Sequence, residues 1–197
     1  FLSISWDNEA KVPHNKLMKD VRFYCESPAL VEFCERAGVK GCKFEWNAAN
    51  DAAARRFNPK KPTNVLQKMM SNRKNDSFKQ YDRFWQAYET DPDLKSVAVV
   101  FHGTPEDRVS HIIKHGLDPK YRRTQAFGKG EYFSKDPGLS TTYCKYGRKM
   151  VVYLVFVPED NEKYYSQRDR DILVIDNICH ELPIGVLTFE DVDKEIV

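Results

Sequence analysis

Two short apolar runs, each about the length of one strand, constrain the fold of this chain more than any other feature. They are Ser-Val-Ala-Val-Val-Phe at residues 96–101 and Met-Val-Val-Tyr-Leu-Val-Phe-Val at residues 150–157. Such continuous runs, rich in valine, are typical of buried strands. Neither run approaches the roughly 20 residues that a membrane-spanning helix needs, so we expect no association with a membrane.

Helical patterns dominate the first half of the chain. Ser27 and Pro28 open a helix that should run to residue 37, where Gly38 provides the left-handed exit. Aromatic residues spaced three and four apart predict a second, amphipathic helix over residues 77–89, and the simplest role of this stripe is core packing. Its members are Phe78, Tyr81, Trp85 and Tyr88. A further helix over residues 63–70 and a strand over residues 39–46 complete this half.

Strands dominate the second half. We expect Thr104 to cap a helix that Gly116 ends, with a loop over residues 118–130 after it. The remaining expected elements are a strand at 131–134, a short helix at 139–144, a charged loop at 158–171, and strands at 172–175 and 184–189. Early helices and late strands predict one α+β domain over residues 1–197, in which residues 1–95 form the less strongly patterned part.

Charge and cysteine content narrow the functional classes. The 31 basic and 29 acidic residues give a net charge of +2, which provides no global argument for binding nucleic acid or membranes. The chain has five cysteines, an odd number that cannot pair completely, and none of them forms a Cys-x-x-Cys motif. We therefore expect neither a disulfide framework nor a zinc site. Reduced thiols and the lack of a visible signal peptide predict an intracellular protein, cytoplasmic or nuclear. The first residue is Phe1, which suggests an excised fragment.

Three polar or aromatic clusters stand where packing alone does not require them. His102, Gly103 and Thr104 follow the first apolar run, and glycine allows a ligand to approach the backbone closely. Two further glycines, in Gly-Lys-Gly at residues 128–130, precede a strand and not a helix, which excludes a phosphate-binding loop of the usual kind. Ser140 and Tyr143 share one face if their segment is helical. Each cluster alone also fits a purely structural role.

In their order and spacing these clusters resemble the catalytic domain of the poly(ADP-ribose) polymerase family, which has the diphtheria-toxin-like ADP-ribosyltransferase fold. The family pattern is His-Gly-Thr/Ser after a strand, a helix that ends in Gly, Gly-x-Gly-x-Tyr-Phe-Ala/Ser, and Ser-x-x-Tyr. This chain has His-Gly-Thr at 102–104, Gly116, Gly-Lys-Gly-Glu-Tyr-Phe-Ser at 128–134 and Ser-Thr-Thr-Tyr at 140–143. Pro-Ile-Gly-Val-Leu-Thr-Phe at 183–189 is similar to the family's last motif, Pro-Glu-Tyr-Leu-Ile-Thr-Phe.

The resemblance implies a mixed, mostly antiparallel sheet with flanking helices, and NAD as co-substrate without a metal. Residues 96–197 would form the core that binds NAD. The residues implied to contact NAD are His102, Gly103, Thr104, Tyr132, Phe133, Ser140 and Tyr143. Tyr132 and Tyr143 would sandwich the nicotinamide ring, Gly103 and Ser140 would bind its carboxamide, and His102 would hydrogen-bond a ribose hydroxyl. With Ile184, His102 and Tyr132 occupy the positions of the family's catalytic residues.

Ile184 is the main departure from the family pattern. It stands where polymerising members have a glutamate, and an apolar residue there goes with transfer of single ADP-ribose units or with no activity. Glu181 and Glu190 are the nearest carboxylates, but their offsets along a strand make them poor substitutes. The resemblance therefore implies a mono-ADP-ribosyltransferase that acts on a protein, on itself or on a nucleic acid. The alternative is an inactive module that binds NAD, ADP-ribose or a protein partner.

The loop at residues 118–130 leaves a further alternative open. Its basic side chains would either neutralise the diphosphate of NAD or form an ordinary solvated surface. These residues are Lys120, Arg122, Arg123 and Lys129.

Overall fold

The computed structural model describes residues 1–7, 10–58, 77–122, 126–157 and 171–193. Its helices are α1 (His14–Glu26), α2 (Pro28–Arg36), α3 (Ala49–Arg56), α5 (Ser77–Thr90), α6 (Glu106–His115) and α7 (Pro137–Thr141). Its strands are β1 (Ser3–Ser5), β2 (Val39–Lys40), β3 (Lys43–Trp46), β4 (Ser96–Gly103), β5 (Glu131–Ser134), β6 (Lys149–Phe156), β7 (Ile172–Ile175), β8 (Glu181–Thr188) and β9 (Asp191–Val192). Short 3₁₀ turns occur at Pro119–Tyr121 and Ile178–His180.

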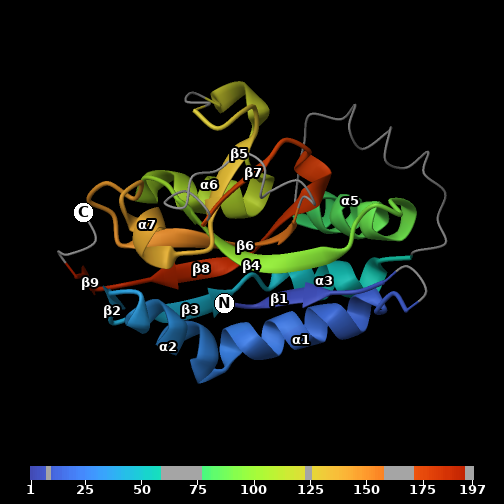
Figure 1. Cartoon of the computed structure of the whole chain (residues 1–197), viewed down its shortest axis with the longest axis horizontal. Coiled ribbons are helices and arrows are strands. Elements are labelled where there is room, and N and C mark those ends of the chain that lie inside the picture. Colours follow the sequence, from blue (N-terminus) through green and yellow to red (C-terminus); the bar gives the residue numbers. More distant parts are fainter. Residues whose placement is uncertain (8–9, 59–76, 123–125, 158–170, 194–197) are drawn as a thin grey trace.

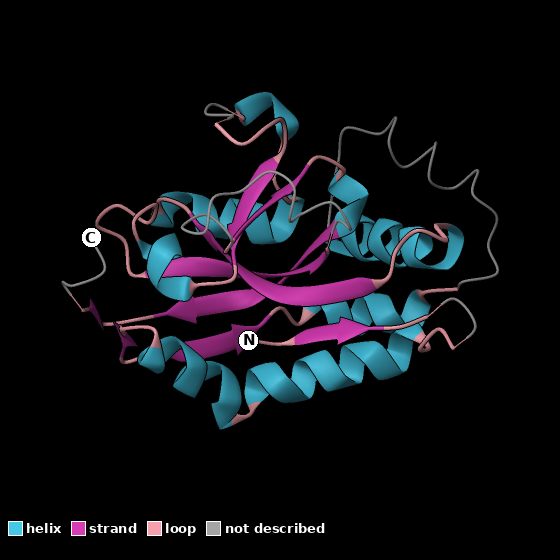
Figure 2. Cartoon of the chain, in the orientation of Figure 1, coloured by secondary structure: helices cyan, strands magenta, loops and turns pink. Residues whose placement is uncertain are grey.

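The described strands form one seven-stranded sheet and a two-stranded ribbon (Figures 1 and 2). The strand order in the sheet is β3-β8-β6-β4-β5-β7, and every pairing is antiparallel. Both apolar runs lie at its centre, as β4 and β6, which pair from Val97 with Phe156 to Gly103 with Met150. The expected α+β fold with a mostly antiparallel sheet and flanking helices is thereby confirmed.

One edge of β4 is shared between two partners. Its first residues pair with β1, whereas at its other end β5 pairs through a single residue pair, Phe101 with Ser134. After that pair β5 diverges and continues alongside β7, so these two strands project from the rest of the sheet in Figure 1. The divergence opens a space beside the end of β4 that regular pairing would fill.

Each face of the sheet has its own hydrophobic core. The larger core lies under α1, α2, α3 and α5, and it includes Leu17, Trp85 and Phe156 among its buried members. The smaller core includes Val100, Phe133 and Tyr153, and α6 packs against it. Alternate residues of β4 and β6 therefore face different cores, which is why their sequences are apolar without interruption.

Helix-start signals in the sequence are confirmed at one site and corrected at another. Ser27 caps α2 through its side chain, which accepts a hydrogen bond from the Ala29 amide at 3.3 Å, and Gly38 has a φ of 83° as its position after the helix requires. The prediction that Thr104 caps the next helix is wrong. The N-cap of α6 is Pro105, and no side-chain cap bond forms there.

Residues 77–89 were expected to form a helix with an aromatic face, and α5 confirms this. Tyr81, Trp85 and Tyr88 are almost completely buried, and Phe84 stacks on Phe156 with ring centroids 4.2 Å apart. Tyr81, Trp85 and Tyr88 therefore belong to the core, as the simplest interpretation of their spacing required, while the side chain of Phe78 lies outside the described part.

The early part of the chain differs most from expectation. Residues 39–46 form two strands, because Gly41 turns the chain with a φ of 64°. Helices α1 and α3 and strand β1 have no counterpart among the predicted elements. The helix expected at 63–70 and nearly all of the loop expected at 158–171 lie outside the described residues.

No described helix is both long and apolar enough to cross a lipid bilayer.

Glu181 is a buried carboxyl group at the start of β8. It is 1% exposed, and neither of its oxygens has a hydrogen-bond partner among the described residues. Burial, with a smaller contribution from Glu131, raises its pKa well above the ordinary value, although Arg83 opposes this shift. Burial therefore favours the protonated, neutral form of this side chain in the folded protein.

We predict that Glu181→Gln stabilises the protein increasingly as the pH rises. The unfolded chain loses the Glu181 proton near pH 4.5, whereas the folded chain keeps it to a much higher pH. Above pH 4.5 the unfolded state thus binds fewer protons, so wild-type stability falls with rising pH. The difference in unfolding free energy between Glu181→Gln and the wild type should grow by about 1.4 kcal/mol per pH unit. This increase should stop at the pKa of Glu181 in the folded protein.

Urea denaturation at several pH values measures this difference. Glu190→Gln, at an exposed position, is the control and should follow the wild-type curve. Parallel curves for Glu181→Gln and wild type would show that Glu181 is ionised in the folded protein.

Candidate active site

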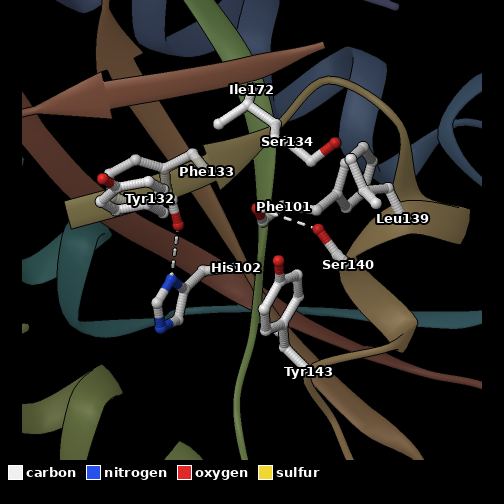
Figure 3. Close-up of a pocket in the computed structure, with 10 residues that line it drawn as sticks. Phe101, His102, Tyr132, Phe133, Ser134, Leu139, Ser140, Tyr143 and Ile172 are labelled. Atoms are coloured by element: carbon white, nitrogen blue, oxygen red, sulfur yellow. Dashed lines mark hydrogen bonds between the residues drawn. The ribbon is translucent and has the colours of Figure 1, made fainter. Parts of the chain in front are cut away.

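A cavity lies where β5 diverges from β4, between these strands, α7 and the start of β7 (Figure 3). It holds about 410 Å³, including its open mouth. The residues that line it are Phe101, His102, Gly103, Tyr132, Phe133, Ser134, Leu139, Ser140, Tyr143 and Ile172. The structure thus brings His102 and Gly103 together with Ser140 and Tyr143, whereas Gly128 and Gly130 are not among the lining residues.

The His102 imidazole is held by a backbone carbonyl. Its Nδ1 lies 2.9 Å from the carbonyl oxygen of Tyr132, and because a carbonyl oxygen only accepts, Nδ1 carries the proton (Figure 3). Burial lowers the pKa of His102 below 6.5, against a smaller opposing effect of this hydrogen bond. The ring is therefore neutral at neutral pH, and its Nε2 is a hydrogen-bond acceptor.

Gly103 lets α7 approach the end of β4 closely. A Cβ atom at this position would lie 1.9 Å from the carbonyl oxygen of Ser140 and 2.9 Å from the Cβ of Tyr143. The Ser140 hydroxyl donates to the Phe101 carbonyl oxygen at 3.2 Å, which joins the helix to the same strand. Asp136 caps α7 by accepting from the Gly138 amide at 2.8 Å. The short helix therefore has a fixed start and a fixed contact with β4.

The two tyrosines differ in how firmly they are held. The Tyr132 hydroxyl accepts from the Phe127 amide at 2.9 Å and donates to the Gly128 carbonyl at 2.8 Å, so it closes the turn before its own strand. Tyr143, after α7, is 61% exposed. Much of the Tyr143 ring is thus open to a flat ligand, whereas Tyr132 is fixed in advance.

Three other predicted site residues contribute little or nothing to the cavity wall. Phe133 lines the cavity, but its ring is 2% exposed and packs on Tyr153 with centroids 4.9 Å apart. Thr104 is buried and does not line the cavity. Ile184 is also absent from the lining, since its side chain is fully buried in the larger core.

An irregularity in β8 accompanies this placement of Ile184. Val152 pairs with Gly185 and Tyr153 pairs with Pro183, so Ile184 is the extra residue of a bulge. Glu181, the other candidate on this strand, is also buried and does not line the cavity either. The structure therefore brings neither residue into contact with the cavity.

Arg122 has a structural role that the sequence did not reveal. Its side chain is 5% exposed and bonds to Glu131 and to Asp176, each at 2.7 Å. Arg122 therefore joins the loop after α6 to β5 and to the end of β7, and it is not a free cation for a diphosphate. Lys129 lies 3.7 Å from Asp176, and Lys120 lies 2.9 Å from Asp118, both on the surface. Arg123 lies outside the described residues.

The apolar part of the cavity has no signal in the sequence. Leu139 and Ile172 line it, yet their sequence context is that of ordinary core residues. Ile172 reaches the cavity because β7 pairs with β5 through Ser134. No signal near residue 172 could have indicated this pairing.

Among the described residues, no group of three or more His, Cys, Asp or Glu side chains is arranged to bind a metal ion.

We predict that Gly103→Ala destabilises the protein by about 1–3 kcal/mol, because the new methyl group meets the Ser140 backbone and not a flexible side chain. Gly128→Ala is the control. It meets no atom within 4 Å, and its cost should be limited to about 1–2 kcal/mol from its φ of 107°. Urea denaturation measures both, and crystallography should show α7 displaced from β4 in Gly103→Ala alone. An undisplaced helix in that variant would contradict the close approach.

Comparison with known families agrees with this geometry. The family model described as the poly(ADP-ribose) polymerase catalytic domain matches residues 60–159, half of the chain. The match contains β4, β5 and α7 with the cavity residues that they carry, and it ends before β7 and β8. The mostly antiparallel sheet with flanking helices is consistent with that family's fold. The chain therefore belongs to the poly(ADP-ribose) polymerase catalytic domain family, whose members are ADP-ribosyltransferases with NAD as substrate.

Proposed function

We propose that this chain is a mono-ADP-ribosyltransferase, which transfers one ADP-ribose unit from NAD to an acceptor and releases nicotinamide. The observation that carries this proposal is the convergence of His102, Gly103, Tyr132, Ser140 and Tyr143 on one cavity. These residues come from a strand end, a second strand and a short helix that are up to 41 positions apart in the sequence.

Nicotinamide recognition uses the wall formed by β4 and α7. The Gly103 backbone provides polar groups with no side chain in the way, and the Ser140 hydroxyl can rotate from the Phe101 carbonyl toward a carboxamide oxygen. The nicotinamide ring in NAD is flat and cationic, so Tyr132 and Tyr143 attract its faces by stacking and by cation–π interaction. Tyr132 is already fixed by its two hydrogen bonds, which lowers the entropic cost of binding.

His102 orients the dinucleotide. Its neutral Nε2 accepts a hydrogen bond from a ribose hydroxyl, while Nδ1 remains on the Tyr132 carbonyl. One backbone carbonyl thus fixes both the ring and the tautomer that an acceptor needs.

Bond breaking occurs between the ribose C1′ and the nicotinamide nitrogen, and it builds positive charge on the ribose. The electron pair of this bond leaves with nicotinamide, which neutralises the pyridinium cation. The site contributes mainly by positioning the reactants. An acceptor oxygen, nitrogen or sulfur then bonds to C1′ and loses its proton. A carboxylate of the target is the simplest such acceptor, because it is already deprotonated.

Single-unit transfer is supported by the chemistry of the cavity wall. Among the described residues, those that line the cavity include no acidic one, and Ile184 is buried in the core. Extending a chain requires activation of a ribose hydroxyl on the previous unit, which a nearby carboxylate normally provides. The acceptor in this proposal is a protein, including the enzyme itself, or a nucleic acid. The five free thiols support placing the activity inside the cell, in the cytoplasm or nucleus.

The same lack of a carboxylate favours a second candidate function. A module that binds NAD or ADP-ribose without reacting would also keep His102 and both tyrosines. Release of free nicotinamide from labelled NAD separates the two, because a binding module leaves the glycosidic bond intact.

We predict that Tyr143→Ala weakens binding of NAD or of a benzamide that mimics nicotinamide, whereas Tyr143→Phe retains most of it. Stacking needs the ring and not the hydroxyl, and the loss should be about 0.5–1.5 kcal/mol beyond the lost contact area. Thermal shift measures this, since a ligand at a hundredfold excess over its Kd stabilises the wild type by about 2.7 kcal/mol. Tyr146→Ala, at a fully exposed position, is the control.

Equal losses for Tyr143→Ala and Tyr143→Phe would overturn the stacking role. A flat response of the wild type at millimolar NAD would count against the whole site.

We predict that each modified residue of the automodified protein carries a single ADP-ribose unit. Intact mass spectrometry followed by digestion counts the units at each residue. Ile184→Glu should not create a polymerase, because it places an unpaired carboxylate in the core at a cost of several kcal/mol. A ladder of linked units on one residue of the wild-type protein would refute single-unit transfer.

A further inference from the structure

Three aromatic rings from three strands pack against one another beside the cavity. They belong to His102 of β4, Phe133 of β5 and Tyr153 of β6. The centroid of the His102 ring lies 5.7 Å from that of Phe133 and 6.2 Å from that of Tyr153. The Phe133 and Tyr153 centroids lie 4.9 Å apart. All three distances fall in the range of favourable aromatic contacts, so the imidazole packs against two other rings at once.

Strand register explains why Tyr153 lies beside His102. Between β4 and β6, Val100 pairs with Tyr153 and His102 pairs with Val151. Opposed residues of an antiparallel pair point to the same face of a sheet, and every second residue along a strand shares that face. His102 and Tyr153 are therefore diagonal neighbours, on the face that the smaller hydrophobic core covers.

The Tyr153 side chain is held by its ring and not by its hydroxyl. Tyr153 is completely buried, and its hydroxyl oxygen has no hydrogen-bond partner among the described residues. A buried hydroxyl without a partner lowers stability, so packing of the ring fixes the position of this side chain. Tyr153 is not among the residues that line the cavity, which means that any effect on a ligand must pass through His102.

We propose that Tyr153 is a positioning residue for His102. The imidazole can turn about its Cβ–Cγ bond, and a half turn would exchange Nδ1 with Cδ2. That exchange would break the 2.9 Å hydrogen bond between Nδ1 and the Tyr132 carbonyl oxygen (Figure 3). The Tyr153 and Phe133 rings restrict this turn because they pack against the imidazole. They thereby keep the proton on Nδ1 and leave Nε2 as the acceptor.

The role of Tyr153 rests on the proposed function only where NAD is concerned. In that proposal His102 binds a ribose hydroxyl, whereas Ser140 and Tyr143 bind nicotinamide. Loss of the Tyr153 ring should therefore weaken binding of NAD but not of benzamide, which carries no ribose. The orientation of the imidazole is a property of the protein alone, and it can be measured without a ligand.

Long-range proton–nitrogen NMR correlations of the imidazoles report the tautomer of each histidine. The chain has five histidines, and His102→Gln assigns the signals of His102. The wild type should show one form of His102, with the proton on Nδ1. Tyr153→Phe should keep this spectrum, and its Tm should equal or exceed that of the wild type, because only the unpartnered hydroxyl is lost. Tyr153→Leu should show mixed tautomers of His102 and bind NAD severalfold more weakly, with unchanged benzamide binding.

Ile112→Ala is the matched control. Ile112 lies on α6 in the same core as Tyr153, so its truncation also leaves a cavity there. A purely structural effect on this core would appear in both variants. We expect Ile112→Ala to lower the Tm without mixing the His102 tautomers and without separating NAD binding from benzamide binding.

Three results would overturn the positioning role. They are a wild-type tautomer of His102 in Tyr153→Leu, equal mixing of tautomers in Ile112→Ala, and a parallel loss of NAD and benzamide binding in Tyr153→Leu. If Tyr153→Leu does not fold, the wild-type spectrum decides, because two exchanging forms of His102 would show that its ring is not held. A wild type that binds neither NAD nor benzamide would refute the proposed function, while the tautomer measurement would still test Tyr153.

Discussion

The separation of β5 from β4 after a single residue pair is the constraint on which the rest of the site depends. A regular antiparallel pairing would bring the two strands to within about 5 Å along their length and leave no room for a ligand. Here only Phe101 and Ser134 pair, and the hydrogen bond from His102 to the Tyr132 carbonyl joins the strands beyond that point. This side-chain bond replaces part of the missing ladder. It also fixes the tautomer of the histidine, so one interaction both supports the opening and prepares its chemistry.

The other walls are built by close approach and by buried charge. Because Gly103 has no side chain, the Ser140 carbonyl can occupy the place that a Cβ would take, and α7 packs against the end of β4. On the opposite side, Arg122 joins Glu131 at the start of β5 to Asp176 after β7. Two charge-assisted hydrogen bonds from one guanidinium, each at 2.7 Å, fix the positions of both carboxylates relative to Arg122. The projecting strands β5 and β7 are thus held at one end by the ion pairs of Arg122 and at the other end by the pairing of β5 with β4.

The sequence anticipated the centre of the sheet and the identities of most cavity residues. Continuous apolar runs and an aromatic stripe with helical spacing are local patterns, and β4, β6 and α5 follow them closely. The predicted cap at Thr104 failed because Pro105 takes the N-cap position itself. The strand predicted over residues 39–46 failed because the left-handed conformation of Gly41 divides it. Helix α1 was missed because no side chain caps its start, although its buried residues Leu17, Met18, Val21 and Cys25 recur at helical spacing.

Sequence alone determined the chemistry of the cavity: a histidine, a serine, two tyrosines and a glycine in an order that resembles one family. These features are local, because each belongs to a motif of a few adjacent residues. The tertiary structure decided what surrounds them. It placed Ile172 in the cavity wall, buried Ile184 in the core, raised the pKa of Glu181 and engaged Arg122 in an ion-pair network. Each of these outcomes depends on strand pairing or burial between residues far apart in the chain, and neither the partner nor the dielectric environment of a side chain is encoded in its immediate neighbours.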